Sequence, residues 1–450
     1  GIYVHGVGVH KAGVVILNSF VEQNLALAGG GGILIYRGRL LLEKTFVSDN
    51  EASTNGGGLL VEGGAVEIKG SSFSHNSAGR NGGAILISGD PVSDGDITSH
   101  YVFRIMSSVV EQNSVDSGNG GGIALIGSSK TKSHVTGLLG NGNAATKGLG
   151  GMLYLEDIDV VIIEQSSMVS NKALQGGALY ITLGSAEIIG DARPENFTAS
   201  TSHLNPAFAG NHAISQNVAD FGGGIFVSQT GIIRMNRMTM KENIAAFDGG
   251  SICTRDIAKV SITATVIIGN EARGRGGGFF LDRLGVITLN LVVISRNMAN
   301  ADGGGLYLGF GTTGTAIDSK FAGNKAIDNG GGVFVSDAPF VAYSTTSLSC
   351  MFKYNAAKAG RGGGLFMERQ ATVDIRGCLF SENALQTGME GGAMAVLNNA
   401  RARVVNSEFR DNVAALFGGA MYAIHNSVIY MERNTFLRNV SGTMPARSGR

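Results

Sequence analysis

The chain has 450 residues, of which 43% are hydrophobic and 70 are glycine, and 35 Lys and Arg residues balance 35 Asp and Glu residues. This composition excludes an intrinsically disordered chain, and without a strict Gly-X-Y period it excludes a collagen-like one. The zero net charge argues against a nucleic-acid partner, and no apolar run approaches the roughly 20 residues that a membrane-spanning helix needs. We therefore expect no nucleic-acid binding and no membrane insertion within this segment.

The chain starts at residues 1–4 (Gly-Ile-Tyr-Val), which lack the charged and long apolar regions of a signal peptide. These residues look instead like the end of the repeat unit described below. We expect residues 1–440 to form a single domain and residues 441–450 to form a tail that leaves the last repeat. Because the end of a solenoid exposes unpaired backbone groups, we also expect a segment of a longer protein, or ends that dock on partners.

A motif in which an apolar residue is followed three positions later by asparagine recurs fifteen times along the chain. In fourteen of these units a glycine run and another apolar stretch follow, and most of the asparagines are 26 to 31 residues apart. A period of this length predicts a solenoid, in which each repeat buries its apolar face only against its neighbours. The motif asparagines are Asn24, Asn50, Asn76, Asn113, Asn141, Asn171, Asn217, Asn243, Asn270, Asn297, Asn324, Asn355, Asn383, Asn412 and Asn439.

The segments between the motifs favour strands over helices. They are short and rich in β-branched residues, as at residues 232–233, 260–262 and 373–375, and none shows a helical period. Three short strands and three turns fit a repeat of this length, which predicts an all-β fold: a parallel β-helix of about 15 coils with three strands per coil. With about 4.8 Å between neighbouring strands, the stacked coils would make a rod roughly 70 Å long.

Each motif position has an expected structural role. The apolar residue three before each asparagine should point inward, and so should the residue five before it, which is usually Ser, Thr or Cys. Asparagine suits a corner because it tolerates left-handed backbone, and its amide can bond to the asparagines of the neighbouring coils. The glycine run should permit positive φ and close packing at the next corner. No Gly-Lys-Ser/Thr follows these glycines, which argues against a phosphate-binding loop.

Cys350 and Cys378 both lie five residues before a motif asparagine, in consecutive coils. They should therefore be stacked neighbours at a separation that a disulfide tolerates. We favour two small buried thiols, and the sequence leaves a disulfide open. Cys253 is the third cysteine, and three cysteines do not make a disulfide framework.

Two spacings between motif asparagines exceed the rest, 37 residues before Asn113 and 46 residues before Asn217. The additional residues fall in expected loops at 88–100 and 184–212. Insertions of a solenoid often lie on its binding face, so these loops are candidate partner sites, with tolerated loops of no function as the alternative. The candidate partner residues are Asp94, Asp96, Arg193, Glu195 and His203, and Asn196 begins an Asn-Phe-Thr glycosylation sequence.

No catalytic constellation follows from the pattern. The outward pairs of residues between the apolar residue and the asparagine form no column of acids. Glu382 and Asp411 lie one coil apart, and we expect them to face opposite ways, whereas a glycoside hydrolase needs two carboxylates facing one bond. The eight histidines are scattered, and no metal-binding motif is present. We therefore predict no catalytic residue, no cofactor and no metal.

Two pairs of segments resemble a known family. Residues 73–76 (Phe-Ser-His-Asn) with 82–85 (Gly-Gly-Ala-Ile), and more loosely 380–383 with 391–394, look like the repeats of chlamydial polymorphic outer-membrane proteins. The resemblance implies a right-handed parallel β-helix of the pectin-lyase-like class, in surface proteins implicated in adhesion. Many units depart from it, with Ile, Val or Met in place of Phe and Gly-Gly-Gly in place of Gly-Gly-Ala.

Three hypotheses for function follow. The first is a non-enzymatic extended scaffold, either a cell-surface adhesin or a structural component of an extracellular filament or envelope assembly. Its partners would be other protein chains of that assembly and glycans. The second is a polysaccharide lyase or hydrolase, which the fold often hosts. The third is a carbohydrate- or protein-binding module that uses the two loops.

Overall fold

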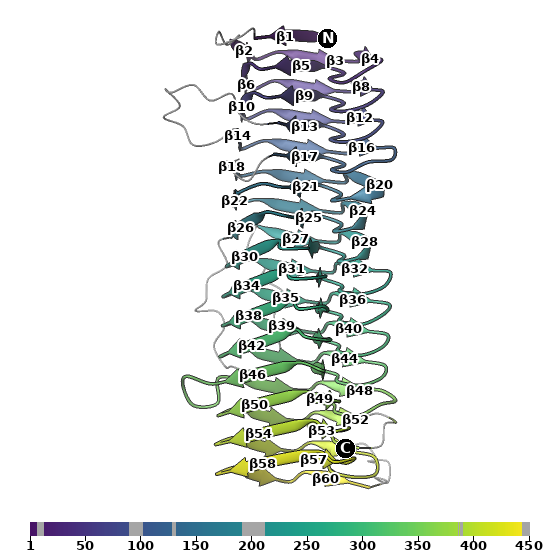
Figure 1. The fold of residues 1–450 in the computed structure, drawn as a ribbon, viewed down its shortest axis with the longest axis vertical. Coiled ribbons are helices and arrows are strands. Elements are labelled where there is room, and N and C mark those ends of the chain that lie inside the picture. Colours follow the sequence, from purple (N-terminus) through teal and green to yellow (C-terminus); the bar gives the residue numbers. More distant parts are fainter. Residues whose placement is uncertain are drawn as a thin grey trace, which may run out of the picture. The chain divides into compact units, whose positions relative to one another are not determined.

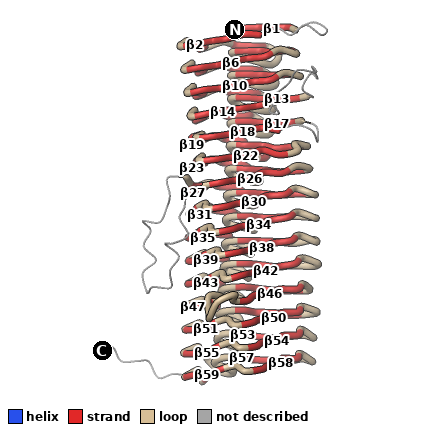
Figure 2. The backbone as a smooth tube through the Cα atoms, turned by 90° about the vertical axis from the view of Figure 1, so that its left-hand side faces the viewer, coloured by secondary structure: helices blue, strands red, loops and turns tan. Residues whose placement is uncertain are grey.

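The structure is a computed structural model that describes residues 1–6, 13–89, 102–127, 132–190, 212–385, 387 and 390–442. The described chain forms two compact units: residues up to Met238 belong to the first and residues from Thr239 onward to the second. All regular structure in the described residues is β-strand (Figure 2). No helix among them is long and apolar enough to cross a membrane.

Each coil contributes one strand to each of four sheets, and the strands within a sheet are parallel. We number the sheets 1 to 4 in the order in which their strands follow one another along a coil (Figure 1). The 60 strands of the described residues therefore make about 15 right-handed coils, as predicted. The prediction of three strands per coil is wrong. The segment after each motif asparagine, such as Glu51–Ala52, also pairs with its counterpart in the next coil and forms the fourth strand. Two residues are too few to show an alternating pattern in the sequence.

In the first unit, the sheets have these strands. Sheet 1 contains β1 (Ile2–His5), β5 (Ile33–Tyr36), β9 (Leu59–Glu62), β13 (Ile85–Ser88), β17 (Ile123–Ile126), β21 (Leu153–Glu156), β25 (Leu179–Thr182) and β29 (Ile225–Ser228). Sheet 2 contains β2 (Gly13–Leu17), β6 (Arg39–Glu43), β10 (Ala65–Lys69), β14 (Phe103–Met106), β18 (Lys132–Thr136), β22 (Val160–Glu164), β26 (Ser185–Ile189) and β30 (Ile232–Asn236). Sheet 3 contains β3 (Phe20–Glu22), β7 (Phe46–Ser48), β11 (Ser72–Ser74), β15 (Val109–Glu111), β19 (Leu139–Asn141), β23 (Ser167–Val169) and β27 (Ala213–Ser215). Sheet 4 contains β4 (Leu25–Ala26), β8 (Glu51–Ala52), β12 (Ser77–Ala78), β16 (Ser114–Val115), β20 (Ala144–Leu149), β24 (Lys172–Gln175) and β28 (Val218–Phe221).

In the second unit, the equivalent sheets have these strands. Sheet 1 contains β33 (Ile252–Thr254), β37 (Phe279–Leu281), β41 (Leu306–Leu308), β45 (Val333–Ser336), β49 (Leu365–Glu368), β53 (Met394–Val396) and β57 (Met421–Ala423). Sheet 2 contains β34 (Lys259–Thr263), β38 (Val286–Asn290), β42 (Thr313–Ile317), β46 (Pro339–Tyr343), β50 (Thr372–Arg376), β54 (Arg401–Val405) and β58 (Val428–Glu432). Sheet 3 contains β31 (Thr239–Lys241), β35 (Val266–Ile268), β39 (Val293–Ser295), β43 (Lys320–Ala322), β47 (Met351–Lys353), β51 (Leu379–Ser381), β55 (Glu408–Arg410) and β59 (Thr435–Leu437). Sheet 4 contains β32 (Ile244–Ala245), β36 (Glu271–Ala272), β40 (Met298–Ala299), β44 (Lys325–Ala326), β48 (Ala356–Ala357), β52 (Ala384–Leu385), β56 (Val413–Ala414) and β60 (Val440–Ser441).

The interior of the second unit contains the predicted ladder of apolar residues from sheet 3. Phe321, Phe352, Phe380 and Phe409 are each completely buried, and their rings stack on one another with centroids 4.4 to 5.0 Å apart. The in-register pairing of β43, β47, β51 and β55 puts these side chains directly above one another. The apolar period in the sequence thus becomes a continuous aromatic column, which buries large apolar area in every coil.

A second apolar layer lies on the outer face of sheet 1. In the second unit, the stacked rings of Phe280, Tyr307, Phe334 and Phe366 have centroids 4.8 to 5.1 Å apart and are almost fully buried. The loops that lead from sheet 4 to sheet 1 cover this face, and the guanidinium carbon of Arg275 in one of them lies 4.7 Å from the Phe280 ring centroid. Between its two end strands, sheet 1 is therefore largely buried on both faces, which explains why these strands show no polar alternation.

Coils turn at single residues with positive φ. At the corner before sheet 1 this residue is glycine in every described coil, whereas at the corner after sheet 3 it is often a larger residue such as Tyr354 (φ 57). The difference is steric. A Cβ on Gly330 would lie 2.5 Å from the carbonyl oxygen of Val333, whereas a Cβ on Gly323, at the other corner, would meet nothing closer than 3.9 Å. Glycine is thus required at the first corner by space as well as by φ.

Candidate functional site

The motif asparagines form hydrogen-bonded ladders within each unit. Each side-chain nitrogen donates to the side-chain oxygen of the asparagine in the next coil at 2.8 to 3.0 Å. The same oxygen accepts the backbone N–H of the preceding asparagine at 2.9 to 3.1 Å. The second amide hydrogen goes to a backbone carbonyl one coil earlier, as from Asn324 to Ile294 at 2.9 Å. One asparagine therefore ties three coils together, which confirms the predicted ladder.

One predicted ladder position is wrong. Asn143, rather than Asn141, accepts from Asn113 and donates to Asn171, and it is completely buried. Asn141 instead ends β19 and is partly exposed. Sheet 3 places Gly140 opposite Val110, so glycine occupies the inward apolar position of this coil and Leu138 occupies the position usually held by Ser or Thr.

The reason for asparagine at the corner is also corrected. Positive φ belongs to the residue before the ladder asparagine, as at Asp49 (φ 55) and His75 (φ 53), and the ladder asparagines have no positive φ. The amide is therefore selected for its two donors and its acceptor, since a buried polar group must be satisfied. The residue before it is outward, and many residue types occupy that position.

The hydroxyl side chains five before the asparagines form a second ladder inside the coils. The backbone N–H of Thr45 donates to the Ser71 hydroxyl at 3.1 Å, and that of Cys378 donates to the Ser407 hydroxyl at 3.1 Å. Cys350 and Cys378 are buried free thiols in this column, and burial raises the pKa of Cys350. Cys253 is also a buried free thiol, with a pKa raised by burial.

The expected partner loops fall mostly outside the described residues. Asp94 and Asp96 of the first loop lie outside the described residues. So do Arg193, Glu195 and His203 of the second loop, together with Asn196 and its glycosylation sequence. These positions stay predictions.

A charged column that the motif reasoning missed lies in the second unit, at the residues that precede the positive-φ glycines. Its members are three acids, two bases and one amide from six consecutive coils: Asp248, Arg275, Asp302, Asn329, Arg361 and Glu390. The Arg275 backbone N–H and side chain both donate to Asp248, and Asn329 donates two bonds to Asp302 at 3.0 Å. Arg361 donates to Asn329 through its backbone and to Glu390 through Nε. A charged or amide residue directly before the glycine run recurs in these coils, and this recurrence could have revealed the column in the sequence.

Burial partly removes the charged side chains of this column from water. The Asp248 side chain is only 10% exposed, and the Arg275 guanidinium lies against the rings of Phe280 and Tyr307. Burial raises the pKa of Asp302, although its bonds from Asn329 act in the opposite direction. Because its members satisfy one another between coils, the column joins neighbouring loops over the outer face of sheet 1.

Glu382 and Asp411 hold the same corner position in consecutive coils, both with positive φ, so the expectation that they face opposite ways is wrong. Each of these carboxylates pairs with a cation in a neighbouring coil, Glu382 with Lys353 at 3.5 Å and Asp411 with Arg438 at 2.7 Å. Among the described residues, no group of three or more His, Cys, Asp and Glu side chains is arranged to hold a metal ion.

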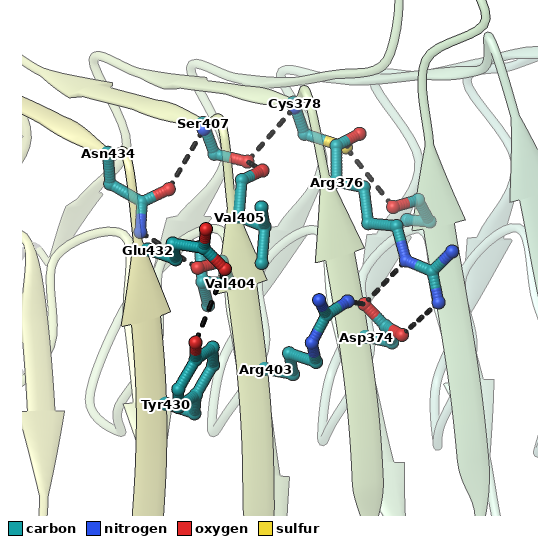
Figure 3. A network of polar contacts seen from close by, with 11 residues as sticks. Asp374, Arg376, Cys378, Arg403, Val404, Val405, Ser407, Tyr430, Glu432 and Asn434 are labelled. Carbon is teal, nitrogen blue, oxygen red and sulfur yellow. Dashed lines mark hydrogen bonds and ion pairs between the residues drawn. The ribbon is translucent and has the colours of Figure 1, made fainter.

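A denser set of charges lies on sheet 2 of the second unit, on neighbouring strands β50, β54 and β58 (Figure 3). Arg376 donates through Nε and Nη2 to the two oxygens of Asp374, and Arg403 donates to the same carboxylate at 3.5 Å. The Arg376 bonds, reinforced by the charge of Arg403, lower the pKa of Asp374. The Tyr430 hydroxyl donates to Glu432 at 3.2 Å. The sequence motifs gave no indication of this exposed network.

The comparison with protein families matched one repeat. Residues 70–88 match the Chlamydia polymorphic membrane protein repeat, and they contain β11, Asn76, β12, the Gly-Gly-Ala run and β13. No curated protein and no solved structure matched the chain. The predicted resemblance to this repeat is confirmed, whereas likeness to pectin-lyase-like proteins stays a prediction. The chain is thus a parallel β-solenoid repeat protein that carries a repeat named after membrane proteins.

Proposed function

We propose that this chain is a non-enzymatic solenoid scaffold at the cell surface, either of an adhesin or of a structural filament or envelope assembly. The observation that carries the proposal is the asparagine ladder, in which each amide binds the coils on both sides. A ladder of this kind uses the recurrent polar residue to hold coils in register. The outward positions are left free to vary, which suits a protein that displays surfaces to partners.

The repeat match supports an extracellular or cell-surface location, because the matched repeat is named for a membrane protein family. The pairing of carboxylates supports a role without catalysis. Glu382 and Asp411 are neutralised by cations of adjacent coils, whereas a general acid needs a carboxyl held protonated and facing its substrate.

A bead assay tests the proposal. Beads coated with the purified chain should attach to cultured epithelial cells, or cross-link one another, more than beads coated with the same chain after unfolding. In parallel, the soluble chain is incubated with a panel of acidic polysaccharides, whose length should stay constant.

Two results would overturn the proposal. Shortening of a polysaccharide that a Glu382→Gln substitution abolishes would establish the lyase or hydrolase alternative. Equal attachment and cross-linking by folded and unfolded chains would remove the evidence for a displayed surface.

A further inference from the structure

The outward side chains of β50, β54 and β58 form an exposed surface that we call the arginine face. Register puts Asp374, Arg403 and Tyr430 side by side across the three strands. Arg401 lies two residues before Arg403 on the same side of β54. The complete set of outward charged and aromatic residues is Asp374, Arg376, Arg401, Arg403, Tyr430 and Glu432.

The charges on this face do not cancel. Asp374 is the only carboxylate that Arg376 and Arg403 share among the described residues. Glu432 is already paired with Arg433 at the adjoining corner. Arg401 is exposed and its side chain has no ion pair or hydrogen bond within the described part of the chain. The three arginines of the face, together with Arg433 at the adjoining corner, thus outnumber its two carboxylates by two, on a chain whose total charge is zero.

Solvent exposure makes this arrangement available to a partner. The Arg376 and Arg403 side chains are 57% and 45% exposed, and Tyr430 is 53% exposed. Surface ion pairs of this kind contribute little to stability, and grouping arginines on neighbouring strands adds repulsion. Stability therefore does not account for the cluster.

The chemistry of the exposed groups defines the partner. Guanidinium groups present planar forks that bind sulfate or carboxylate oxygens in pairs. The Arg403 guanidinium carbon lies 5.9 Å from the Tyr430 ring centroid, so a cation and an apolar ring surface are presented together. An extended chain that carries anionic groups at intervals and apolar sugar faces between them matches both features.

We infer that the arginine face binds a linear sulfated polysaccharide. This inference rests on the proposed surface role and names one partner for it. Nucleic acid fits the face less well. Proteins that bind nucleic acid usually carry a wider basic surface and make about 6 to 10 phosphate contacts. An acidic protein would match the charge, but would make no use of the flat ring of Tyr430.

The test uses the full chain and heparin as the probe, with affinity measured by calorimetry at increasing NaCl concentration. The double substitution Arg401→Gln and Arg403→Gln should weaken heparin binding at least tenfold and reduce its salt dependence. The matched control is Arg410→Gln on sheet 3 with Arg438→Gln at the corner that follows β59. Arg410 pairs with Glu408 at 3.5 Å and is 40% exposed, closely like Arg403. The control should retain affinity within about twofold.

Further probes separate the alternatives. Tyr430→Ala should weaken heparin binding severalfold without changing its salt dependence, and unsulfated dextran should not bind. Equal losses in test and control variants, or binding of duplex DNA or polyglutamate as tightly as heparin, would overturn the inference. Absence of heparin binding by a chain that still attaches to cells would overturn this inference alone. Heparin that binds but is shortened would instead overturn the non-enzymatic role.

Discussion

The sulfur of Met152 lies 3.2 Å from the side-chain nitrogen of Asn143, in the space that an inward side chain at residue 140 would occupy. A Cβ on Gly140 would be 2.5 Å from that sulfur. Other coils have the reverse arrangement, with Val, Ile, Met or Phe at the inward position of sheet 3 and Gly, Ala or Ser at the position before sheet 1. Met152 and Gly140 are therefore a compensating pair.

This pair makes a double-mutant prediction. Met152→Ala should destabilise the first unit by about 2 to 5 kcal/mol because it leaves a cavity, and Gly140→Val by about 1 to 3 kcal/mol because it overpacks the same space. The double variant should be at least about 2 kcal/mol more stable than the sum of the two single losses predicts, because the new valine fills the cavity that the loss of Met152 leaves. Urea unfolding measures all three. Additive losses would show that the two residues do not share one space.

The asparagine ladder predicts a large loss for a small change. Asn324→Ala leaves the carbonyl of Ile294 and the side-chain nitrogen of Asn297 without their partner, both in buried positions. At about 1 to 3 kcal/mol for each unsatisfied group, we expect a loss of about 3 to 5 kcal/mol. Asn290→Ala, on the outer side of β38, is the control and should change stability by less than about 0.5 kcal/mol. Similar losses at both positions in denaturant unfolding would contradict a special role for the ladder.

The effect of crowding can be separated from that of φ by comparing two glycines that have the same φ. Gly330 and Gly323 both have φ 66, but only Gly330 is crowded by a neighbouring carbonyl. Gly323→Ala should cost about 1 to 2 kcal/mol, the strain of left-handed backbone. Gly330→Ala should cost at least about 2 kcal/mol more, because the chain must move to admit the methyl group. Thermal and urea unfolding of both variants provide the measurement, and equal costs would mean that φ alone selects glycine.

Asp302 predicts a pH dependence. Burial raises the pKa of Asp302 in the folded state, so the folded protein holds this proton to higher pH than the unfolded chain does. The contribution of Asp302 to the free energy of unfolding is favourable below its pKa in the unfolded chain, about 3.9. This contribution is lost as the pH rises through its pKa in the folded protein. Asp302→Asn keeps an acceptor for Asn329 and should remove this loss, so the variant gains stability relative to the wild type as pH rises from about 4.

The control for this experiment is Asp328→Asn, at an exposed position one residue before Asn329. It removes the same formal charge without touching the bonds to Asp302. Because the charge of Asp328 adds to the raised pKa of Asp302, we expect this variant to show a smaller change in the same direction. Unfolding free energies of both variants between acid and neutral pH decide the matter. If the wild type instead gains stability relative to Asp302→Asn with rising pH, the folded-state pKa of Asp302 is lowered and the prediction is wrong.

Much of the site could not be predicted because it depends on which residues meet between coils. The acid and base residues before the glycine runs vary in type, so no motif connects Asp248 with Arg275 until stacking brings them together. The arginine face has the same origin. Asp374 and Arg403 are 29 residues apart and meet only because β50 and β54 are paired in register.

The sequence by itself determined the parallel solenoid, the inward column of apolar residues and nearly all of the asparagine ladder. These features repeat in nearly every coil, so a period in the chain is enough to specify them. Only the tertiary structure decided that Asn143 replaces Asn141, because both fit the period and the difference lies in which amide reaches Asn113 and Asn171. It also decided the fourth strand, since a two-residue segment becomes a strand only when its neighbours in the next coil supply its hydrogen bonds.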